Sequence, residues 1–96
     1  MHLCPVCGYD GLVLPPEDFY TCPCCGTEFG YHDAAETYVG REQQWERLRR
    51  RWYERGATWF SPVIPQPPGW DADGQLLRVI GANFRSTSLR PQFVLA

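Results

Sequence analysis

Four of the five cysteines near the start of the chain have the spacing of a metal site. Cys4, Cys7, Cys22 and Cys25 form the pattern C-x2-C-x14-C-x2-C. Two residues between paired cysteines let both thiolates face one ion from a single tight turn, and four thiolates complete the coordination of a tetrahedral metal. The sequence therefore predicts that these four residues bind one metal ion.

Each cysteine pair is embedded in a similar turn, here called the first knuckle (residues 4–8) and the second knuckle (residues 22–26). A proline follows the first cysteine of each pair, and a glycine follows the second. Proline fixes φ and lacks an N–H group, so the remaining backbone donors can point back at the sulfur atoms. Glycine permits the positive φ that such a turn usually needs.

Two other uses of paired cysteines are disfavoured by their context. Disulfides need an oxidising compartment, but Met1-His2-Leu3 leaves no room for a secretory signal before the first knuckle. Because no long apolar run that could span a membrane follows, we expect a cytoplasmic protein that does not associate with membranes. A thioredoxin-like redox pair expects a βαβ context, which the sequence lacks.

Cys24 lies inside the second knuckle, where it could replace a neighbouring ligand or remain free. Adjacent cysteines rarely both reach one ion from so tight a turn, so we expect a free thiol with no catalytic role. Reactivity would require a lowered pKa and exposure to solvent. His2 and His32 are expected at the surface or beside the site, because four cysteines already close it.

Four-thiolate sites hold zinc, and they also hold a single redox-active iron. The stretch Cys4-Pro5-Val6-Cys7-Gly8-Tyr9 resembles the first knuckle of rubredoxin-type domains, and Cys22-Pro23-Cys24-Cys25-Gly26 resembles the second. The short spacer is similar to the rubredoxin-like appendage of rubrerythrins, although the di-iron helical bundle of those proteins is missing from the sequence. We expect one structural zinc ion, with iron as the alternative.

The length of 96 residues allows one small domain. So short a chain buries a modest core, and a structural zinc ion would add on the order of 10 kcal/mol of apparent folding free energy. The net charge of −2 is unevenly distributed, because residues 1–40 contain acids and no Lys or Arg, whereas residues 41–55 carry six Arg against three Glu. The site is therefore expected to be acidic and the following element basic.

These features predict a small α+β fold with a single domain over residues 1–80. Its parts are an N-terminal zinc ribbon (residues 1–33), in which short antiparallel strands carry the two knuckles, and one amphipathic helix at about 38–56. A proline-rich strap and a short second helix follow over residues 57–80, and residues 81–96 form a tail. Each strand is too short to be stable without the ion.

The predicted amphipathic helix has one aromatic face, and the rest of its circumference is basic. Residues that recur at helical spacing and mark one face are Tyr38, Trp45, Leu48 and Trp52. This face is expected to cover the ribbon. The rest of the circumference carries the candidate contacts to nucleic acid or to a partner, which are Arg47, Arg49, Arg50 and Arg51. Interleaved glutamates at i,i+4 spacing favour a solvated, partly salt-paired surface instead.

The strap after this helix contains four prolines, which exclude regular helix and central strand. Its apolar residues are expected to fold back over ribbon and helix: Trp59, Phe60, Val63, Ile64 and Trp70. A P-x-x-P ligand motif over residues 62–68 is the alternative. Asp71 is predicted to cap the short second helix. In the tail, a plausible hydrophobic anchor on this chain or on a neighbour consists of Phe93, Val94 and Leu95.

With both knuckle motifs in view, the chain resembles the bacterial cysteine-rich CPCC family of small zinc-ribbon proteins. The resemblance is specific over residues 3–33 and looser over residues 52–76. It implies a zinc site and no established enzymatic activity. Some members resemble immunity components of bacterial toxin systems, which would imply a protein partner.

The sequence thus predicts a non-enzymatic zinc protein that binds another, unidentified protein, as an adaptor or an immunity-like module. A closed four-cysteine site offers no open coordination position for catalysis. The alternatives are a nucleic-acid-binding zinc ribbon that uses the arginine-rich helix, and a rubredoxin-like iron protein that transfers electrons. The sequence leaves the oligomeric state open.

Overall fold

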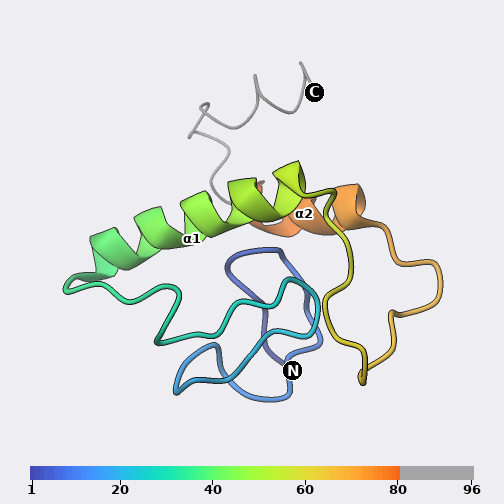
Figure 1. The fold of residues 1–96 in the computed structure, drawn as a ribbon, viewed down its shortest axis with the longest axis horizontal. Coiled ribbons are helices and arrows are strands. Elements are labelled where there is room, and N and C mark those ends of the chain that lie inside the picture. The colour runs from blue at the N-terminus through green and yellow to red at the C-terminus, as the bar shows by residue number, and fades with distance from the viewer. Residues whose placement is uncertain (81–96) are drawn as a thin grey trace.

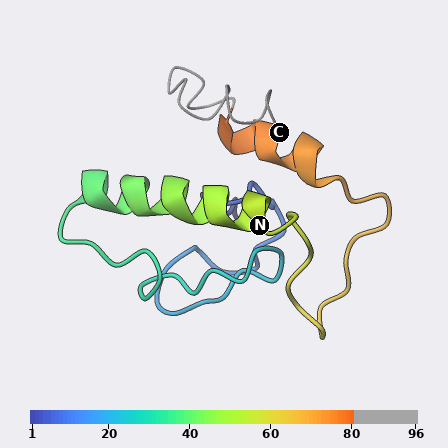
Figure 2. The same ribbon diagram turned by 45° about the horizontal axis from the view of Figure 1, so that its top comes forward.

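A computed structural model describes residues 1–80 of the chain. It contains two helices within this range, α1 (Tyr38–Glu54) and α2 (Ala72–Ile80). The loops of the first third of the chain lie beneath α1 in Figure 1, and most of them also do so in the turned view of Figure 2. The predicted tail, with its anchor Phe93-Val94-Leu95, lies outside the described residues.

The strands of the predicted zinc ribbon are reduced to isolated antiparallel bridges in the described chain. One joins His2 to Leu12 and the other joins Thr21 to Glu28. The amide of His2 donates to the Leu12 carbonyl at 2.8 Å, and the amide of Leu12 donates back at 3.1 Å. Pairing stops there because the chain turns at once into a knuckle, whose amides donate to sulfur and to carbonyls within the turn. The expected α+β fold is therefore helices and loops with almost no strand.

The N-terminus of α1 is capped by Thr37, whose hydroxyl accepts a hydrogen bond from the Gly40 amide at 2.9 Å. The helix ends at Glu54, two residues before the predicted limit, and Gly56 follows with φ of +107°. Of the predicted aromatic face, Trp52 is buried, and Trp45 and Leu48 are half-buried against the core. Tyr38 departs from the prediction, because it is 64% exposed.

A buried carboxylate fixes the first half of α1 to the segment that precedes it. Asp33 Oδ2 accepts a hydrogen bond from the Trp45 indole Nε1 at 2.7 Å, and Asp33 Oδ1 accepts one from the Gly30 amide at 2.6 Å. No role was predicted for Asp33 from the sequence. Its contact with Trp45 sets the direction in which the helix leaves the loops.

The strap is held at both ends and open in the middle. Backbone amides of Phe60 and Ser61 donate to the carbonyls of Cys24 and Pro23 at 3.0 and 2.9 Å, so the strap lies along the second knuckle. Trp59 and Trp70 pack edge to face with ring centroids 5.6 Å apart. The prediction of a strap folded over the core thus holds for the tryptophans, which are half-buried against the core.

The middle of the strap differs from the prediction, because Phe60, Val63 and Ile64 are 57%, 83% and 46% exposed. The Ser61 hydroxyl accepts hydrogen bonds from the amides of Val63 and Ile64 at 3.1 and 2.9 Å, which bends the chain just after Pro62. A P-x-x-P ligand is recognised in an extended polyproline conformation. This bend therefore disfavours the P-x-x-P interpretation.

The second helix is capped as predicted, with Asp71 Oδ2 accepting a hydrogen bond from the Gly74 amide at 3.1 Å. Its buried residues are Gln75, Leu76 and Val79. Leu77 points away from the core and is 66% exposed. Neither α1 nor α2 is long and apolar enough to cross a membrane.

The segment that joins the two knuckles is largely exposed. Val13, Leu14 and Phe19 are 65%, 54% and 65% exposed, whereas Leu12 just before them is fully buried. Asp18 and Phe19 both adopt positive φ, at +57° and +63°. This linking turn (residues 13–19) therefore lies outside the core and contributes little to it.

Candidate metal centre

The four predicted ligands converge on one point. The sulfur atoms of Cys4, Cys7, Cys22 and Cys25 all lie within 4.8 Å of one another, and all four residues are buried. Cys4 Sγ and Cys25 Sγ are 3.8 Å apart, as are Cys7 Sγ and Cys22 Sγ. None of these cysteines forms a disulfide. This group, called the cage below, could hold a metal ion.

The sulfur spacing suits a tetrahedral ion. A metal–sulfur bond of roughly 2.3 Å, the usual length for zinc thiolates, gives a tetrahedron with edges of roughly 3.8 Å. The two short sulfur pairs, Cys4–Cys25 and Cys7–Cys22, have this separation. Each pair joins one knuckle to the other, so a bound ion would cross-link the two turns.

Backbone amides of each knuckle point at the first sulfur of their own pair, as the proline positions predicted. The amides of Val6 and Cys7 approach Cys4 Sγ at 3.4 and 3.5 Å. In the second knuckle, the Cys24 amide approaches Cys22 Sγ at 3.4 Å. Hydrogen bonds of this kind stabilise the charged form of a thiol, so both turns favour thiolate ligands.

The glycines close each turn with the positive φ that was expected of them. Gly8 and Gly26 have φ of +87° and +80°, and their amides donate to the carbonyls of Cys4 and Cys22, both at 2.9 Å. A side chain at either position would also strike another part of the molecule. A Cβ at Gly26 would lie 2.6 Å from the ring of Phe60. The two knuckles are thus equivalent turns, each covered by a different later segment.

Burial and crowding shift the pKa values of the cage thiols in opposite directions. Burial raises the pKa of Cys4 and of Cys7, and hydrogen bonds to neighbouring thiols, that of Cys22 first, raise them further. Hydrogen bonds with the other cage thiols, again that of Cys22 first, lower the pKa of Cys25 despite its burial. The Thr27 hydroxyl, 3.2 Å from Cys25 Sγ, also lowers it.

Arg49 was predicted on the exposed basic surface, but it is 4% exposed and lies against the first knuckle. Its Nε donates to the Val6 carbonyl and its guanidinium NH2 group donates to the Pro5 carbonyl, both at 2.7 Å. Burial lowers the pKa of Arg49, while the negative charge of Glu46 and of the cage thiols opposes that shift. The buried guanidinium therefore sits in the electrostatic field of the cage.

The other arginines that were predicted to contact nucleic acid or a partner do not share the buried position of Arg49. Arg47 and Arg51 are exposed, and the Arg47 side chain donates to the amide oxygen of Gln44. Arg50 is half-buried, and its Nε has no hydrogen-bond partner among the described residues. Arg49 follows Trp45 by four residues and precedes Trp52 by three, a spacing that could have placed it on the aromatic face.

Cys24 lies outside the cage and forms no disulfide, as expected of a free thiol, and it is fully buried. It accepts a hydrogen bond from the side-chain Nε2 of Gln75 at 3.3 Å. His32 is exposed, and its Nδ1 accepts a hydrogen bond from the Glu28 amide at 2.8 Å. Neither residue belongs to the group that could hold the ion.

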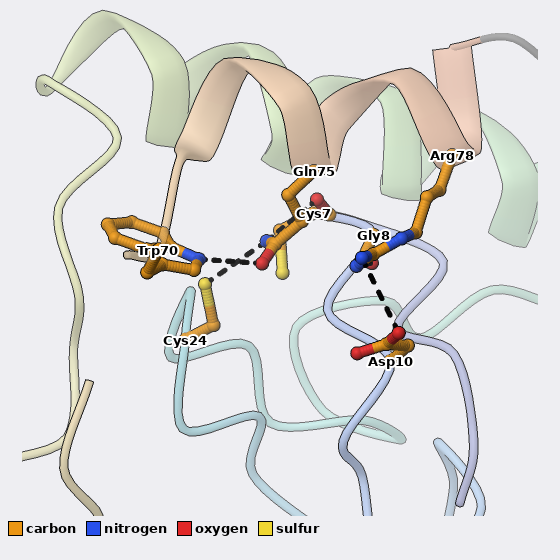
Figure 3. A network of polar contacts seen from close by, with 7 residues as sticks. All are labelled: Cys7, Gly8, Asp10, Cys24, Trp70, Gln75 and Arg78. Carbon is orange, nitrogen blue, oxygen red and sulfur yellow. Dashed lines mark hydrogen bonds and ion pairs between the residues drawn. The ribbon is translucent and has the colours of Figure 1, made fainter. Parts of the chain in front are cut away.

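Two side chains of α2 contact the first knuckle, and sequence reasoning had assigned neither of them (Figure 3). Gln75 Nε2 donates to the Cys7 carbonyl at 3.0 Å. Arg78 donates to the Gly8 carbonyl at 2.9 Å and forms an ion pair with Asp10 at 3.5 Å. The Asp71 cap and the fourth position of Gln75 in the helix gave some indication of how α2 is oriented. The residues that α2 contacts, however, lie about 70 positions earlier in the sequence.

Two bacterial proteins are similar to this chain. YoaQ of Bacillus subtilis (strain 168) is 34% identical to it, over 68% of this chain and 69% of YoaQ. YozI of the same organism is 29% identical, over 69% of each chain. Both carry the description "uncharacterized protein". No family model matches the chain, and no solved structure matches it.

Proposed function

This chain belongs to the family of the Bacillus subtilis protein YoaQ, and we propose that it is a zinc-stabilised protein-binding module without enzymatic activity. One observation carries the proposal. The four thiols that could hold an ion are buried, between 0% and 6% exposed, and are closed over by their own turns. Four protein ligands leave no position for water or a substrate on a tetrahedral ion. The site therefore suits a structural ion.

The charge around the cage supports a divalent ion. Four thiolates around one divalent cation carry a net charge of −2, and a charge of that size is costly to bury without compensation. The buried Arg49 guanidinium supplies a positive charge against the first knuckle. Four neutral thiols would leave this guanidinium buried without a counter-charge from the cage.

The protein-binding part of the proposal is supported by apolar side chains that the described chain leaves in solvent. Val63 and Phe60 of the strap are 83% and 57% exposed. Tyr38 and Val39 at the start of α1 are 64% and 62% exposed. Contiguous exposed apolar surface often marks a site of contact with another protein, and each of these two neighbouring pairs could form part of such a surface. The resemblance to the CPCC family, some of whose members resemble immunity proteins, points the same way.

Metal analysis of protein purified without added metal tests the first half of the proposal. We expect a colourless protein with one zinc ion per chain. Because iron–thiolate centres absorb visible light and zinc centres do not, a coloured protein with one iron per chain would replace this proposal by the electron-transfer alternative. Protein that folds with no metal would remove both.

A binding experiment tests the second half. We expect the wild-type chain to form a stoichiometric complex with one protein from its own organism, and Val63→Asp to lose it while keeping zinc. Leu77→Asp, which adds the same charge at another exposed position, is the control for a general effect of charge. A catalytic turnover that depends on the cysteine-bound metal would contradict the proposal.

A further inference from the structure

Gln75 lies outside both knuckles, and its side chain contacts each of them by a hydrogen bond. It is buried, at 5% exposed, and its Nε2 donates to the carbonyl of the ligand residue Cys7 at 3.0 Å and to the Cys24 sulfur at 3.3 Å. Figure 3 shows the carboxamide between the two turns, reached from α2 above. One side chain from residue 75 thus holds together two turns from the first 26 residues.

Trp70 fixes the orientation of this carboxamide. Its indole Nε1 donates to Gln75 Oε1 at 2.7 Å. Indole is a hydrogen-bond donor only, so the oxygen of the amide must face Trp70 and the amino group must face the knuckles. Trp70 therefore presents both N–H groups of Gln75 to the Cys7 carbonyl and the Cys24 sulfur.

The backbone of α2 lies against the same turn. A Cβ on Gly8, the residue after the ligand Cys7, would lie 2.4 Å from the carbonyl oxygen of Gln75. The first knuckle is consequently enclosed by Arg49 of α1 and by Gln75 of α2. The backbone of Cys7 cannot move away from the cage without breaking its hydrogen bond to Gln75.

We propose that Gln75 is a positioning residue that retains the metal ion, although it is not a ligand. By holding the Cys7 carbonyl and the Cys24 sulfur, its carboxamide resists the separation of the two knuckles through which the ion would leave. This inference rests on the proposed function, because it requires an ion in the four-cysteine cage. The inference adds that a residue of α2 slows the release of the metal ion.

The size of the effect follows from the behaviour of groups that support metal ligands. Removing a hydrogen-bond partner of a metal ligand typically changes metal affinity by about 10- to 100-fold. Because Gln75 contacts the backbone of Cys7 and not its sulfur, we expect the lower end of this range, expressed as faster release. Replacing Gln75 by Met keeps an unbranched side chain of similar length and removes both donors. The buried Cys7 carbonyl and the Trp70 indole then each lose a partner, which is unfavourable in a site closed to water.

The rate of zinc transfer to an excess of a chromogenic chelator measures retention in the full, zinc-loaded chain. We expect Gln75→Met to release zinc on the order of ten times faster than wild type. Gln75→Glu, which keeps the acceptor for Trp70 and loses the donors, should also release zinc faster, and it serves if the Met variant does not fold. The matched control is Arg78→Met, which removes a half-exposed contact to the neighbouring Gly8 carbonyl and should release zinc at close to the wild-type rate.

A double-variant cycle separates positioning from a loss of packing. Trp70→Phe keeps an aromatic ring and removes the donor that orients Gln75, so it should also accelerate release. Because both residues act through the same carboxamide, Trp70→Phe combined with Gln75→Met should be little faster than Gln75→Met alone. Fully multiplicative effects would overturn the proposal. The visible spectrum of the cobalt-substituted variants should match wild type, which shows that the four-thiolate cage is intact.

Failure of this inference is distinguishable from failure of the proposed function. If the wild-type chain binds no zinc, the proposed function fails and this inference falls with it. If the wild type holds one zinc ion but folded Gln75 variants release it at the wild-type rate, only this inference is wrong. Equal acceleration by Arg78→Met and Gln75→Met would assign retention to the docking of α2 as a whole and would likewise overturn a specific role for the carboxamide.

Discussion

The buried side chain of Arg49 interacts electrostatically with the cage. A guanidinium that is 4% exposed has lost its hydration, and it recovers only part of that loss from two backbone carbonyls. Negative charge nearby offsets part of the rest, because Glu46 and the cage thiols Cys4, Cys7 and Cys25 all favour the charged form of Arg49. Thiolates around a divalent cation would add to this negative charge. Arg49 thus links α1 to the first knuckle by hydrogen bonds and to the cage by electrostatic attraction.

Replacing Arg49 should destabilise the zinc-loaded protein. Arg49→Met leaves the Pro5 and Val6 carbonyls without donors and removes the compensating charge, so we expect a loss of about 3 kcal/mol in the free energy of unfolding. Arg49→Lys should lose less, because it keeps the charge but not the two-pronged geometry. Urea unfolding followed by tryptophan fluorescence measures both. Arg47→Met on the exposed side is the control, and an equal loss there would contradict the special position of Arg49.

The cysteines should divide into ligands and one bystander. We expect Cys7→Ser and Cys22→Ser to lose metal and tertiary structure together, because each removes one corner of the cage. Cys24→Ser should keep one equivalent of metal and a native fold, since its sulfur lies outside the cage and a serine hydroxyl can still accept the hydrogen bond from Gln75. Metal content and near-ultraviolet circular dichroism test this. Loss of metal from Cys24→Ser and its retention by Cys25→Ser would reverse the ligand assignment.

Metal affinity should rise with pH. Burial raises the pKa of Cys4 and Cys7, so without a bound cation these thiols hold their protons at neutral pH. The ion must displace those protons, because thiolates are the ligands. Zinc binding therefore releases protons, and acidification favours the protonated thiols and the loss of zinc. Competition titrations with a chelator of known pH dependence test the sign, which an affinity independent of pH would contradict.

At the scale of elements, α2 depends on the knuckle that it covers. It has nine residues, and helices of this length are not stable by themselves in water. Leu76 and Val79 supply its apolar contacts, and Gln75 and Arg78 supply its hydrogen bonds to the first knuckle. Because Gly8 has no side chain, α2 can pack closely against the first knuckle, and we expect the helix to form only in this contact.

Substitution of Gly8 tests this close approach. Gly8→Ala introduces a Cβ 2.4 Å from the Gln75 carbonyl oxygen, whereas a Cβ at Gly69 would have nothing within 4 Å. Both glycines have positive φ, so both alanines carry a backbone strain of about 1 kcal/mol. We expect Gly8→Ala to cost at least about 2 kcal/mol more in the free energy of unfolding, because α2 must also move. Similar losses for the two variants in urea unfolding would contradict the tight docking of α2.

Apart from the four-cysteine cage, which the paired spacing predicts, what could be predicted from the sequence was local. The knuckle turns, the extent of α1 and the Asp71 cap each depend on residues within a few positions of one another. The antiparallel strands were predicted from β-prone segments, but the turns consume the amides that a ladder would need. Arg49 and Gln75 were missed as supports of the site, since they contact carbonyls 43 and 68 positions away. A buried polar side chain is recognisable only when its distant partner is known.

At the scale of the molecule, the cage is part of the core formed by the described residues. The buried cluster contains all five cysteines together with few large apolar residues, among them Val6, Leu12, Phe29 and Trp52. A core of this kind has little hydrophobic driving force without the link between the knuckles. An ion bound in the cage would thus take the place that aliphatic side chains occupy in larger domains.

Removal of metal should unfold the described domain as one unit. We expect a strong chelator to abolish the near-ultraviolet circular dichroism of the tryptophans and the helical signal of α1 together, because α1 packs on the loops that the ion joins. Restoring zinc should recover both signals. Retention of the helical signal after complete metal removal would show that α1 is stable by itself and would contradict this dependence.

The exposed linking turn has a consequence for how relatives can diverge. Closing a flexible loop costs entropy that grows only with the logarithm of its length, about 0.6 kcal/mol for each doubling. Residues 13–19 could therefore gain or lose several positions at small cost, whereas an insertion within either knuckle would break the contact between its glycine amide and the carbonyl of its first cysteine. This architecture therefore permits relatives in which each C-x2-C pair keeps its four residues while the spacer between the two pairs varies in length.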